Sequence, residues 1–154
     1  QLDRVPYALN DIVIHRTGMS QLISLVVAVN GEYLATYGAD GIILSTPTGS
    51  TGYNMSAGGP IVDPKADLIL ITPINSHDIT SKSIVVGADA NITVELSTRR
   101  PEKDETADVS FDGDRIVHMK VGDKILVRKA AKSTEILKLN RVSFLQILRR
   151  KMRP

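Results

Sequence analysis

The sequence predicts a mainly β fold, a two-sheet antiparallel β-sandwich formed by a single domain over residues 1–154. Short apolar runs recur along the chain, and turn-forming Gly, Pro, Asn and Asp residues separate them. Helical periodicity is confined to two short stretches. A chain of this length buries roughly 68–70% of its unfolded surface, so one hydrophobic core is sufficient.

The early strands are separated by a clear turn signal. The run Leu22–Val29 is almost continuously apolar, as expected for a strand that is covered on both faces. Asn30-Gly31 separates it from Tyr33–Tyr37, and this dipeptide favours a type I′ turn because both residues accept positive φ. Further strands are expected at Ile12–Ile14, Ile42–Leu44, Leu68–Ile71, Ile84–Val86, Ile92–Leu96, Val109–Phe111, Arg115–Met119, Lys124–Arg128 and Glu135–Leu139.

Other turn signals and two helices complete the predicted order. Pro73 is expected to end the strand before it, and Asp112-Gly113 to form a second tight turn. Ser50–Ala57 is expected to form one or two helical turns, with its first residue, a serine, as the N-cap. Val142–Lys151 predicts a C-terminal amphipathic helix, because its apolar residues share one face and arginines occupy its last turn.

Composition and charge exclude several function classes. The net charge is +2 and aromatic residues make up only 4%, so we expect no nucleic-acid partner even though basic residues gather near the C-terminal end. The absence of cysteine excludes disulfides and thiolate metal sites, and the three histidines lack the spacing of a metal site. No apolar run approaches the ~18 residues that a membrane span needs. We therefore expect a cytoplasmic protein with no membrane partner.

The most informative segment is the hydroxyl-rich loop, residues 45–56, which follows an apolar strand directly. It contains no basic residue. Such a density of neutral hydrogen-bonding groups suits a nucleoside better than a bare phosphate. An ordinary Ser/Thr-rich turn between two strands is the alternative interpretation. The polar residues of the loop are Ser45, Thr46, Thr48, Ser50, Thr51, Tyr53, Asn54 and Ser56, beside Gly49 and Gly52.

Six blocks of the sequence occur in an order that carries a family resemblance. They are Asn10-Asp11, Asp40-Gly41, Thr46–Tyr53 with Ser56–Pro60, Ile71–Ile74, Ser110–Gly113 and Phe144–Lys151. Together these blocks resemble the C-terminal domain of the NAD kinase family, and they span nearly the whole chain. The family's Gly-Gly-Asp-Gly-Thr motif is not among them, so the resemblance implies that an N-terminal α/β domain carrying it lies outside this chain.

The resemblance implies roles for particular residues. In the family, the dipeptide matched by Asn10 and Asp11 contacts the adenosine half of NAD, although the acidic residue there is usually glutamate. Asp40 is implied to lie near the nicotinamide carboxamide, and Tyr53 to stack on a ring, while Gly52 stands in place of an alanine. The NAD-binding residues implied in this way are Asn10, Asp11, Asp40, Thr48, Thr51, Gly52, Tyr53, Asn54, Met55, Ser56, Thr72 and Ile74.

The activity implied by the resemblance is phosphoryl transfer from ATP, or from polyphosphate, to the adenosine-ribose 2′-hydroxyl of NAD, which gives NADP. Mg²⁺ or another divalent cation is expected to accompany ATP. No catalytic residue is expected in this chain, so the isolated domain is expected to be inactive. The family also implies a homo-oligomer, a dimer or a tetramer.

Two other interpretations are compatible with a sandwich of this kind. One is the C-terminal domain of a related lipid kinase, which is expected to lack the Thr48–Tyr53 pocket. The other is a non-catalytic dinucleotide-binding or oligomerisation module. NADP formation by the complete protein would separate an NAD kinase from both.

Overall fold

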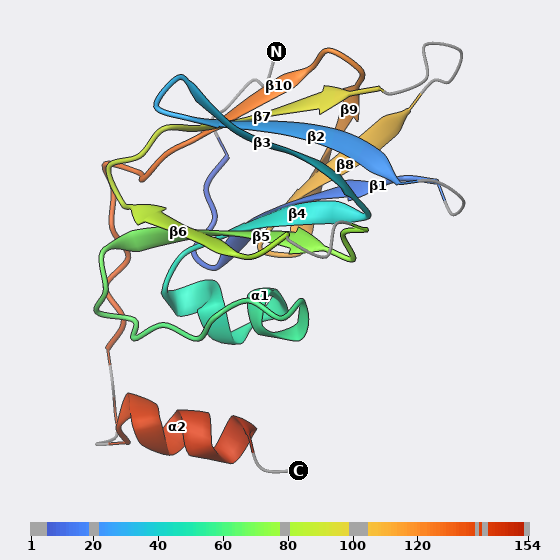
Figure 1. The fold of residues 1–154 in the computed structure, drawn as a ribbon. Coiled ribbons are helices and arrows are strands. Elements are labelled where there is room, and N and C mark those ends of the chain that lie inside the picture. The colour runs from blue at the N-terminus through green and yellow to red at the C-terminus, as the bar shows by residue number, and fades with distance from the viewer. Residues whose placement is uncertain are drawn as a thin grey trace.

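A computed structural model describes residues 6–18, 22–77, 81–98, 105–137, 139 and 142–152. Two antiparallel sheets pack face to face and form the predicted sandwich, which confirms the fold class (Figure 1). The six-stranded sheet has the order β6-β5-β4-β1-β8-β9 and the four-stranded sheet the order β10-β7-β2-β3. The strands are β1 (Asp11–Arg16), β2 (Ile23–Val29), β3 (Glu32–Ala39), β4 (Gly41–Ser45), β5 (Leu68–Ile74), β6 (Ile84–Gly87), β7 (Ile92–Ser97), β8 (Thr106–Phe111), β9 (Asp114–Lys120) and β10 (Lys124–Val127).

The core lies between the two sheets. Strands at the sandwich interface alternate buried and partly exposed residues, as in β7 and β8, because successive side chains point to opposite faces of a strand. Ile14 and Ile42 from the six-stranded sheet and Leu25 and Val94 from the four-stranded sheet are completely buried. Apolar burial of this kind is the main stabilising contribution to a sandwich. This burial also fixes the register of β1, since a shift by one residue would turn Ile14 away from the core.

Both predicted tight turns are present. Asn30 has φ 52° and Gly31 has φ 83°, which is the left-handed backbone that a type I′ turn needs between β2 and β3. Asp112 and Gly113, with φ 52° and 75°, connect β8 to β9 in the same way. Asp and Asn tolerate this conformation better than other residues that carry a Cβ.

One predicted strand boundary and one predicted strand are wrong. Pro73 does not end its strand but lies inside β5, where it pairs with Ile42. The outer neighbour β6 pairs with β5 only as far as Ile71, so the missing N–H of the proline interrupts no bond on that side. The strand expected at the C-terminal end is also absent, since residues 135–137 are exposed without regular structure and residue 138 lies outside the described residues.

The hydroxyl-rich loop folds into two short helices. A 3₁₀ turn covers Thr48–Thr51, and α1 covers Tyr53–Ser56. Ser50 is not the N-cap that the sequence predicts, because it lies inside the 3₁₀ turn. Its Oγ instead accepts a hydrogen bond from the Val62 N–H at 3.0 Å and donates to the Val62 carbonyl. A serine hydroxyl that satisfies a distant segment is unavailable for capping.

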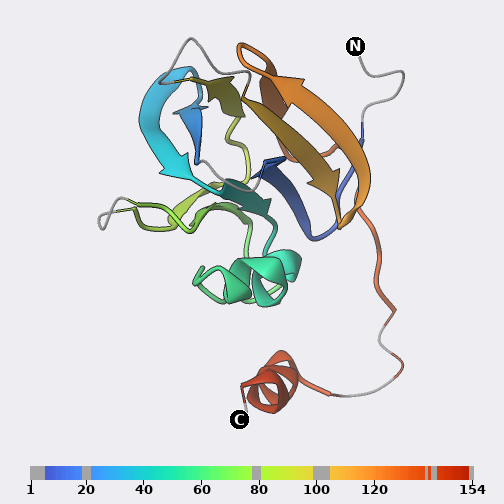
Figure 2. The same cartoon turned by 90° about the vertical axis from the view of Figure 1, so that its right-hand side faces the viewer.

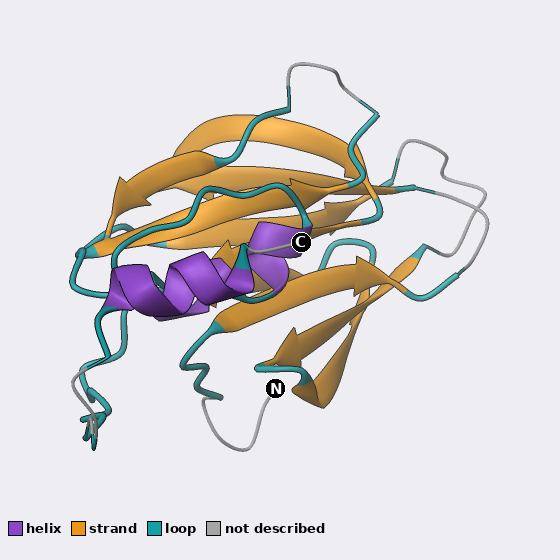
Figure 3. Ribbon diagram, turned by 90° about the horizontal axis from the view of Figure 1, so that it is seen from below, coloured by secondary structure: helices purple, strands orange, loops and turns teal. Residues whose placement is uncertain are grey.

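The C-terminal helix α2 (Phe144–Lys151) agrees with the prediction. Ser143 and Gln146 form a capping box at its start, which satisfies backbone N–H groups that a helix leaves unpaired. Figure 2 shows α2 set apart from the sandwich at the end of an extended connector. Seen from below, both helices lie on the same side of the molecule (Figure 3). Neither is long or apolar enough to cross a membrane, and the same holds for every helix in the described residues.

Candidate functional site

A pocket of about 690 Å³ lies where the start of β1, the hydroxyl-rich loop, the β8–β9 turn and the end of α2 meet. Most of its lining groups are polar, and they come from segments far apart in the sequence. A concave site with several convergent polar groups is the usual form of a small-molecule site. The lining residues are Asn10, Asp11, Val13, His15, Thr48, Thr51, Gly52, Tyr53, Ser110, Asp112, Gly113 and Lys151.

Asp11 is the buried acidic group of this pocket. The residue is only 8% exposed, and its carboxylate accepts no hydrogen bond from any described residue. Burial raises the pKa of the Asp11 carboxyl above its ordinary value, and the nearby charge of Asp112 raises it further. Among the described residues, the fully enclosed side-chain oxygen without a partner belongs to Glu105, so the Asp11 oxygens open onto the pocket. The arrangement therefore favours a ligand that brings its own hydrogen-bond donors to Asp11.

Asp112 holds the backbone that carries Asp11. Its carboxylate accepts hydrogen bonds from the N–H groups of Leu9 and Asn10, both at 2.7 Å, and of Asp11 at 3.1 Å. The Asp112 N–H donates in turn to the Asp11 carbonyl at 3.0 Å. Hydrogen bonds to an ionised acceptor are stronger than neutral ones. The turn between β8 and β9 thus fixes the position of the segment that enters β1.

The hydroxyl-rich loop packs directly against the same segment. Thr46 Oγ1 donates to the Leu9 carbonyl at 2.7 Å and accepts from the Gly49 N–H at 3.1 Å. At Gly49 a Cβ atom would lie 2.1 Å from the Asn10 carbonyl oxygen, closer than any real contact. Glycine is therefore needed here so that the two backbones can approach each other. This contact brings the loop to the edge of the pocket beside Asp11.

The loop presents an aromatic ring and a lysine contact at the pocket. Tyr53, the first residue of α1, is 43% exposed and lines the pocket. Lys151, at the end of α2, donates to the carbonyl and the hydroxyl of Thr51, each at 3.3 Å. At Gly52 a Cβ atom would lie 3.2 Å from the Gly49 carbonyl oxygen and 4.0 Å from the Asp11 carboxylate. The loop and Asp11 therefore face the same space.

Comparisons with known proteins identify the family of the chain. Residues 9–139 match the family model of the ATP-NAD kinase C-terminal domain. This chain belongs to the NAD kinase family. It is 60% identical over 145 residues to the NAD kinase of Agathobacter rectalis, a match that covers 94% of this chain and 51% of that protein. It is 43% identical over 144 residues to the NAD kinase of Lachnoclostridium phytofermentans, covering 94% of this chain and 50% of that one.

Solved NAD kinase structures share the fold. Yeast NADH kinase complexed with NADH superposes with a TM-score of 0.72 at 36% identity, over 79% of this chain and 34% of that one. An Archaeoglobus fulgidus NAD kinase in complex with ATP gives a TM-score of 0.71 at 31% identity, over 80% and 46% of the two chains. The chain spans about half the length of the curated relatives that it matches. The family that the sequence resembles is therefore confirmed.

Half of the residues that the NAD kinase resemblance implied line the pocket. These are Asn10, Asp11, Thr48, Thr51, Gly52 and Tyr53. Met55 and Ser56 lie in α1 outside the lining, and Ile74 is a buried core residue at 5% exposure. The resemblance thus leads both to residues that face the pocket and to residues that lie behind it.

Asn54 and Thr72 lie outside the pocket lining and hold the hydroxyl-rich loop against the six-stranded sheet. Asn54 is fully buried and donates to the carbonyls of Ser50 and Pro60 at 3.0 and 2.9 Å. Thr72 Oγ1, on β5, donates to Asn54 Oδ1 at 2.7 Å. Because every polar atom of the Asn54 amide has a partner, this network holds the loop in shape. Both residues act on the pocket through the backbone of the loop.

Asp40 lies outside the pocket, in a separate polar cluster next to β1. Its Oδ1 pairs with Arg16 Nε at 2.5 Å, and its Oδ2 accepts from Asn75 Nδ2 at 3.0 Å. The Asn75 hydrogen bond, together with the Arg16 hydrogen bond and charge, lowers the pKa of the Asp40 carboxyl below its ordinary 3.8. The contact with nicotinamide that the resemblance implies stays a prediction, since both oxygens have protein partners here.

Asp40→Asn is expected to destabilise the domain by about 1 kcal/mol at pH 7, because it removes a charged acceptor from a partly buried pair. A lowered folded pKa stabilises the fold above the ordinary pKa and loses that effect as the pH falls through the folded pKa. Thermal unfolding of wild type and variant at pH 7 should therefore differ, and the difference should disappear in strong acid. The control is Asp67→Asn, whose ion pair with Lys129 is well exposed and should contribute little. A difference that persists unchanged in strong acid would contradict the assigned charge effect.

The described residues do not fit a cation site. They contain no group of three His, Cys, Asp or Glu side chains that could hold a metal ion. Asp11 and Asp112 both border the pocket, but Asp112 already accepts three backbone hydrogen bonds. Mg²⁺ prefers octahedral oxygen coordination with phosphate ligands. No step of the chemistry is therefore assigned to a metal on this chain.

Sequence reasoning missed the position of Lys151. The sequence predicts an amphipathic helix with basic residues in its last turn, which explains Lys151 by the helix dipole alone. The structure brings it to Thr51, 100 positions away. No local signal indicates this, because the contact joins two residues that are far apart in the sequence. His15, one of the three histidines that lack the spacing of a metal site, also borders the pocket.

Proposed function

We propose that this chain is the dinucleotide-binding domain of an NAD kinase, an enzyme that transfers a phosphoryl group from ATP or polyphosphate to the adenosine-ribose 2′-hydroxyl of NAD. The observation that carries the proposal is Asp11, a largely buried residue whose carboxylate opens onto the pocket and accepts no hydrogen bond from a described residue. Ribose hydroxyls are donors of the kind that acidic residues accept in dinucleotide sites. Asp11 is then the acceptor for the adenosine ribose of NAD.

The remaining lining groups suit the rest of an adenosine. The exposed ring of Tyr53 offers a flat apolar surface on which adenine can stack. Thr48 and Thr51 add hydroxyls that both donate and accept, as the ring nitrogens and amino group of adenine require. The volume of about 690 Å³ falls within the range of small-molecule sites. The similar yeast NADH kinase is in complex with NADH and the Archaeoglobus fulgidus NAD kinase with ATP, which also supports an adenine nucleotide ligand.

In this proposal the chain positions the acceptor rather than moving the phosphate. Phosphoryl transfer depends on in-line placement of the hydroxyl and on neutralising the charge of the phosphates. Asp11 orients the ribose, and the groups that handle ATP and its divalent cation belong to the half of the protein that carries the Gly-Gly-Asp-Gly-Thr motif. The proposal includes assembly into a homo-oligomer, which light scattering of the complete protein would measure.

The test is NADP formation by the complete protein that contains this chain, with ATP and with polyphosphate as alternative donors. An NAD kinase gives NADP with at least one donor and does not phosphorylate diacylglycerol or sphingosine. Binding of NAD without turnover would favour the non-catalytic module instead. Failure to bind NAD would reject the dinucleotide site.

Tyr53→Ala is expected to weaken NAD binding by about 1–3 kcal/mol, the usual contribution of one base stacked on an aromatic ring. Its effect on thermal stability should be small, because Tyr53 is 43% exposed and lies outside the hydrophobic core. Tyr53→Phe should bind NAD nearly as well, since it keeps the ring. Isothermal titration of the complete protein measures the affinity. The matched control is Tyr33→Ala, which removes another exposed tyrosine far from the pocket lining. Equal NAD affinity in Tyr53→Ala and wild type would reject the stacking role.

A further inference from the structure

We infer that Asp112 is a positioning residue for the dinucleotide: it holds the segment from Leu9 to Asp11 so that the Asp11 carboxylate faces the pocket. The inference rests on the proposed function and deepens it, because it says how the ribose acceptor is fixed in place. Three backbone N–H groups donate to the Asp112 carboxylate, two of them at 2.7 Å. All three belong to the residues that lead into β1.

Leu9 and Asn10 need this support because they precede the strand, which begins at Asp11. The pairing of β1 with β4 starts at Asp11 and the pairing with β8 at Ile12, so the N–H groups of Leu9 and Asn10 have no strand partner. Leu9 and Asn10 are exposed, so without Asp112 their N–H groups would bond to water, and the contacts that fix the segment to the β8–β9 turn would be lost. Asp112 satisfies both groups with one rigid side chain, which β8 and β9 hold from either side.

The turn itself does not require a carboxylate. Asp112 has φ 52°, a conformation that asparagine adopts as readily as aspartate. Asparagine would close the same turn without placing a second negative charge beside the buried Asp11. The charge of Asp112 instead opposes ionisation of Asp11. The Asp112 carboxylate thus opposes ionisation of Asp11 and is not needed to form the turn. Its presence is best explained by the three N–H groups that it binds, which position Asp11.

The charge of Asp112 also gives a readout that a purely structural role would not move. The titratable groups that line the pocket around Asp11 are His15 on β1, Tyr53 on α1, Asp112 in the β8–β9 turn and Lys151 on α2. NAD binding that depends on ionised Asp11 weakens as the pH falls through the pKa of that carboxyl. Removing the Asp112 charge lowers this pKa. The fall in NAD affinity at acidic pH, here called the acid limb of the affinity–pH profile, should therefore move to lower pH.

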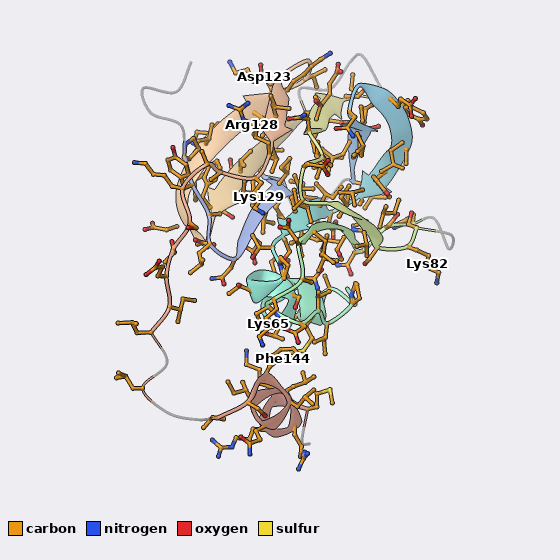
Figure 4. The ribbon with its side chains drawn as sticks, turned by 90° about the vertical axis from the view of Figure 1, so that its left-hand side faces the viewer. Lys65, Lys82, Asp123, Arg128, Lys129 and Phe144 are labelled. Carbon is orange, nitrogen blue, oxygen red and sulfur yellow. The ribbon has the colours of Figure 1, made fainter. Side chains whose placement is uncertain are left out.

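The experiment compares Asp112→Asn and Asp123→Asn in the complete protein. Asp123 is the matched control, because its carboxylate also accepts a backbone N–H in a hairpin, from Lys120 at 2.8 Å. Figure 4 shows it at the opposite end of the molecule from α2, so it cannot affect the pocket directly. Both substitutions remove one negative charge and one carboxylate acceptor from a turn.

Asp112→Asn is expected to weaken NAD binding about tenfold, since a misplaced site residue loses about that much or more. Its acid limb should move to lower pH, whereas Asp123→Asn should change neither quantity. Asp112→Glu, which keeps the charge but displaces the carboxylate, should weaken binding without moving the limb. This variant also keeps the test decisive if Asp112→Asn folds poorly by thermal unfolding.

NAD affinity of Asp112→Asn within about twofold of wild type, or an equal loss in Asp123→Asn, would overturn the positioning role. The role would also be overturned if the acid limb of Asp112→Asn stayed in place while Asp112→Asn and Asp123→Asn unfolded at the same lowered temperature. Wild-type protein that binds no NAD would instead overturn the proposed function. The wild-type measurement therefore separates failure of the function from failure of the inference.

Discussion

Asp11→Asn in the complete protein is expected to weaken NAD binding about tenfold to a hundredfold, yet to raise the unfolding temperature at neutral pH. The loss of affinity follows because an amide replaces an ionised acceptor, and a hydrogen bond to a charged group contributes about 1.5–3 kcal/mol. The gain in stability follows because burial of the residue and the nearby charge of Asp112 both oppose ionisation of the Asp11 carboxyl. Function and stability then place opposite demands on one residue.

The direction of the stability change follows from the raised pKa of Asp11. A carboxyl whose folded pKa is raised binds its proton more tightly in the folded state. Ionisation then destabilises the fold progressively as the pH rises above the ordinary pKa. Asp11→Asn removes that cost. The advantage of the variant should disappear below the ordinary pKa of 3.8, where Asp11 is protonated in both states.

Thermal unfolding at neutral and acidic pH, together with NAD titration, measures both effects of Asp11→Asn. Asp11→Glu is the control, because it keeps the charge and should retain most of the affinity. An asparagine variant that binds NAD like wild type would contradict the role of Asp11 as ribose acceptor. Equal loss of affinity and of stability would instead indicate that the substitution damages the fold.

Gly49→Ala is expected to abolish NAD binding and to destabilise the domain by about 1–3 kcal/mol or more, as overpacking against rigid neighbours does. The added Cβ would lie 2.1 Å from the Asn10 carbonyl oxygen and 2.7 Å from Ser45 Oγ. The nearest neighbour is backbone, so no rotation of a side chain relieves the contact. Either the hydroxyl-rich loop or the segment before β1 must move, and both border the pocket.

Gly18→Ala is the matched control for Gly49→Ala. At Gly18 a Cβ atom meets nothing within 4 Å, and no positive φ opposes the substitution. Chemical unfolding and NAD titration of the two variants should therefore give a large effect for Gly49 and almost none for Gly18. A Gly49→Ala protein with wild-type affinity would show that the close approach of the loop to Asn10 is not needed for the site.

The sandwich and the family could be predicted from the sequence because both depend on local signals. Asn30-Gly31 gives its turn through backbone preference alone, and the apolar runs define strands by their pattern. The errors arise where distant partners decide. Pro73 is tolerated because the pairing of β5 with β6 reaches only Ile71. Ser50 bonds to Val62 rather than capping a helix.

The candidate site divides in the same way. The sequence pattern led to the hydroxyl-rich loop and to Asn10 and Asp11, which the fold brings together. It could not distinguish Tyr53, whose side chain faces the pocket, from Asn54, whose amide is buried beneath the loop. It also gave no sign that Lys151 would reach Thr51, since that contact joins two residues that are far apart in the sequence.

The sequence separation between Asp11 and Asp112 has a consequence during synthesis. The two residues lie 101 positions apart, and β1 pairs with β8 in the middle of the six-stranded sheet. A nascent chain that has emerged only through β7 exposes the open edge of β1 to other chains. Such unpaired edges favour aggregation, and long-range pairing is slow. β8 must therefore emerge before this domain is protected, and the candidate site is among the last parts to form.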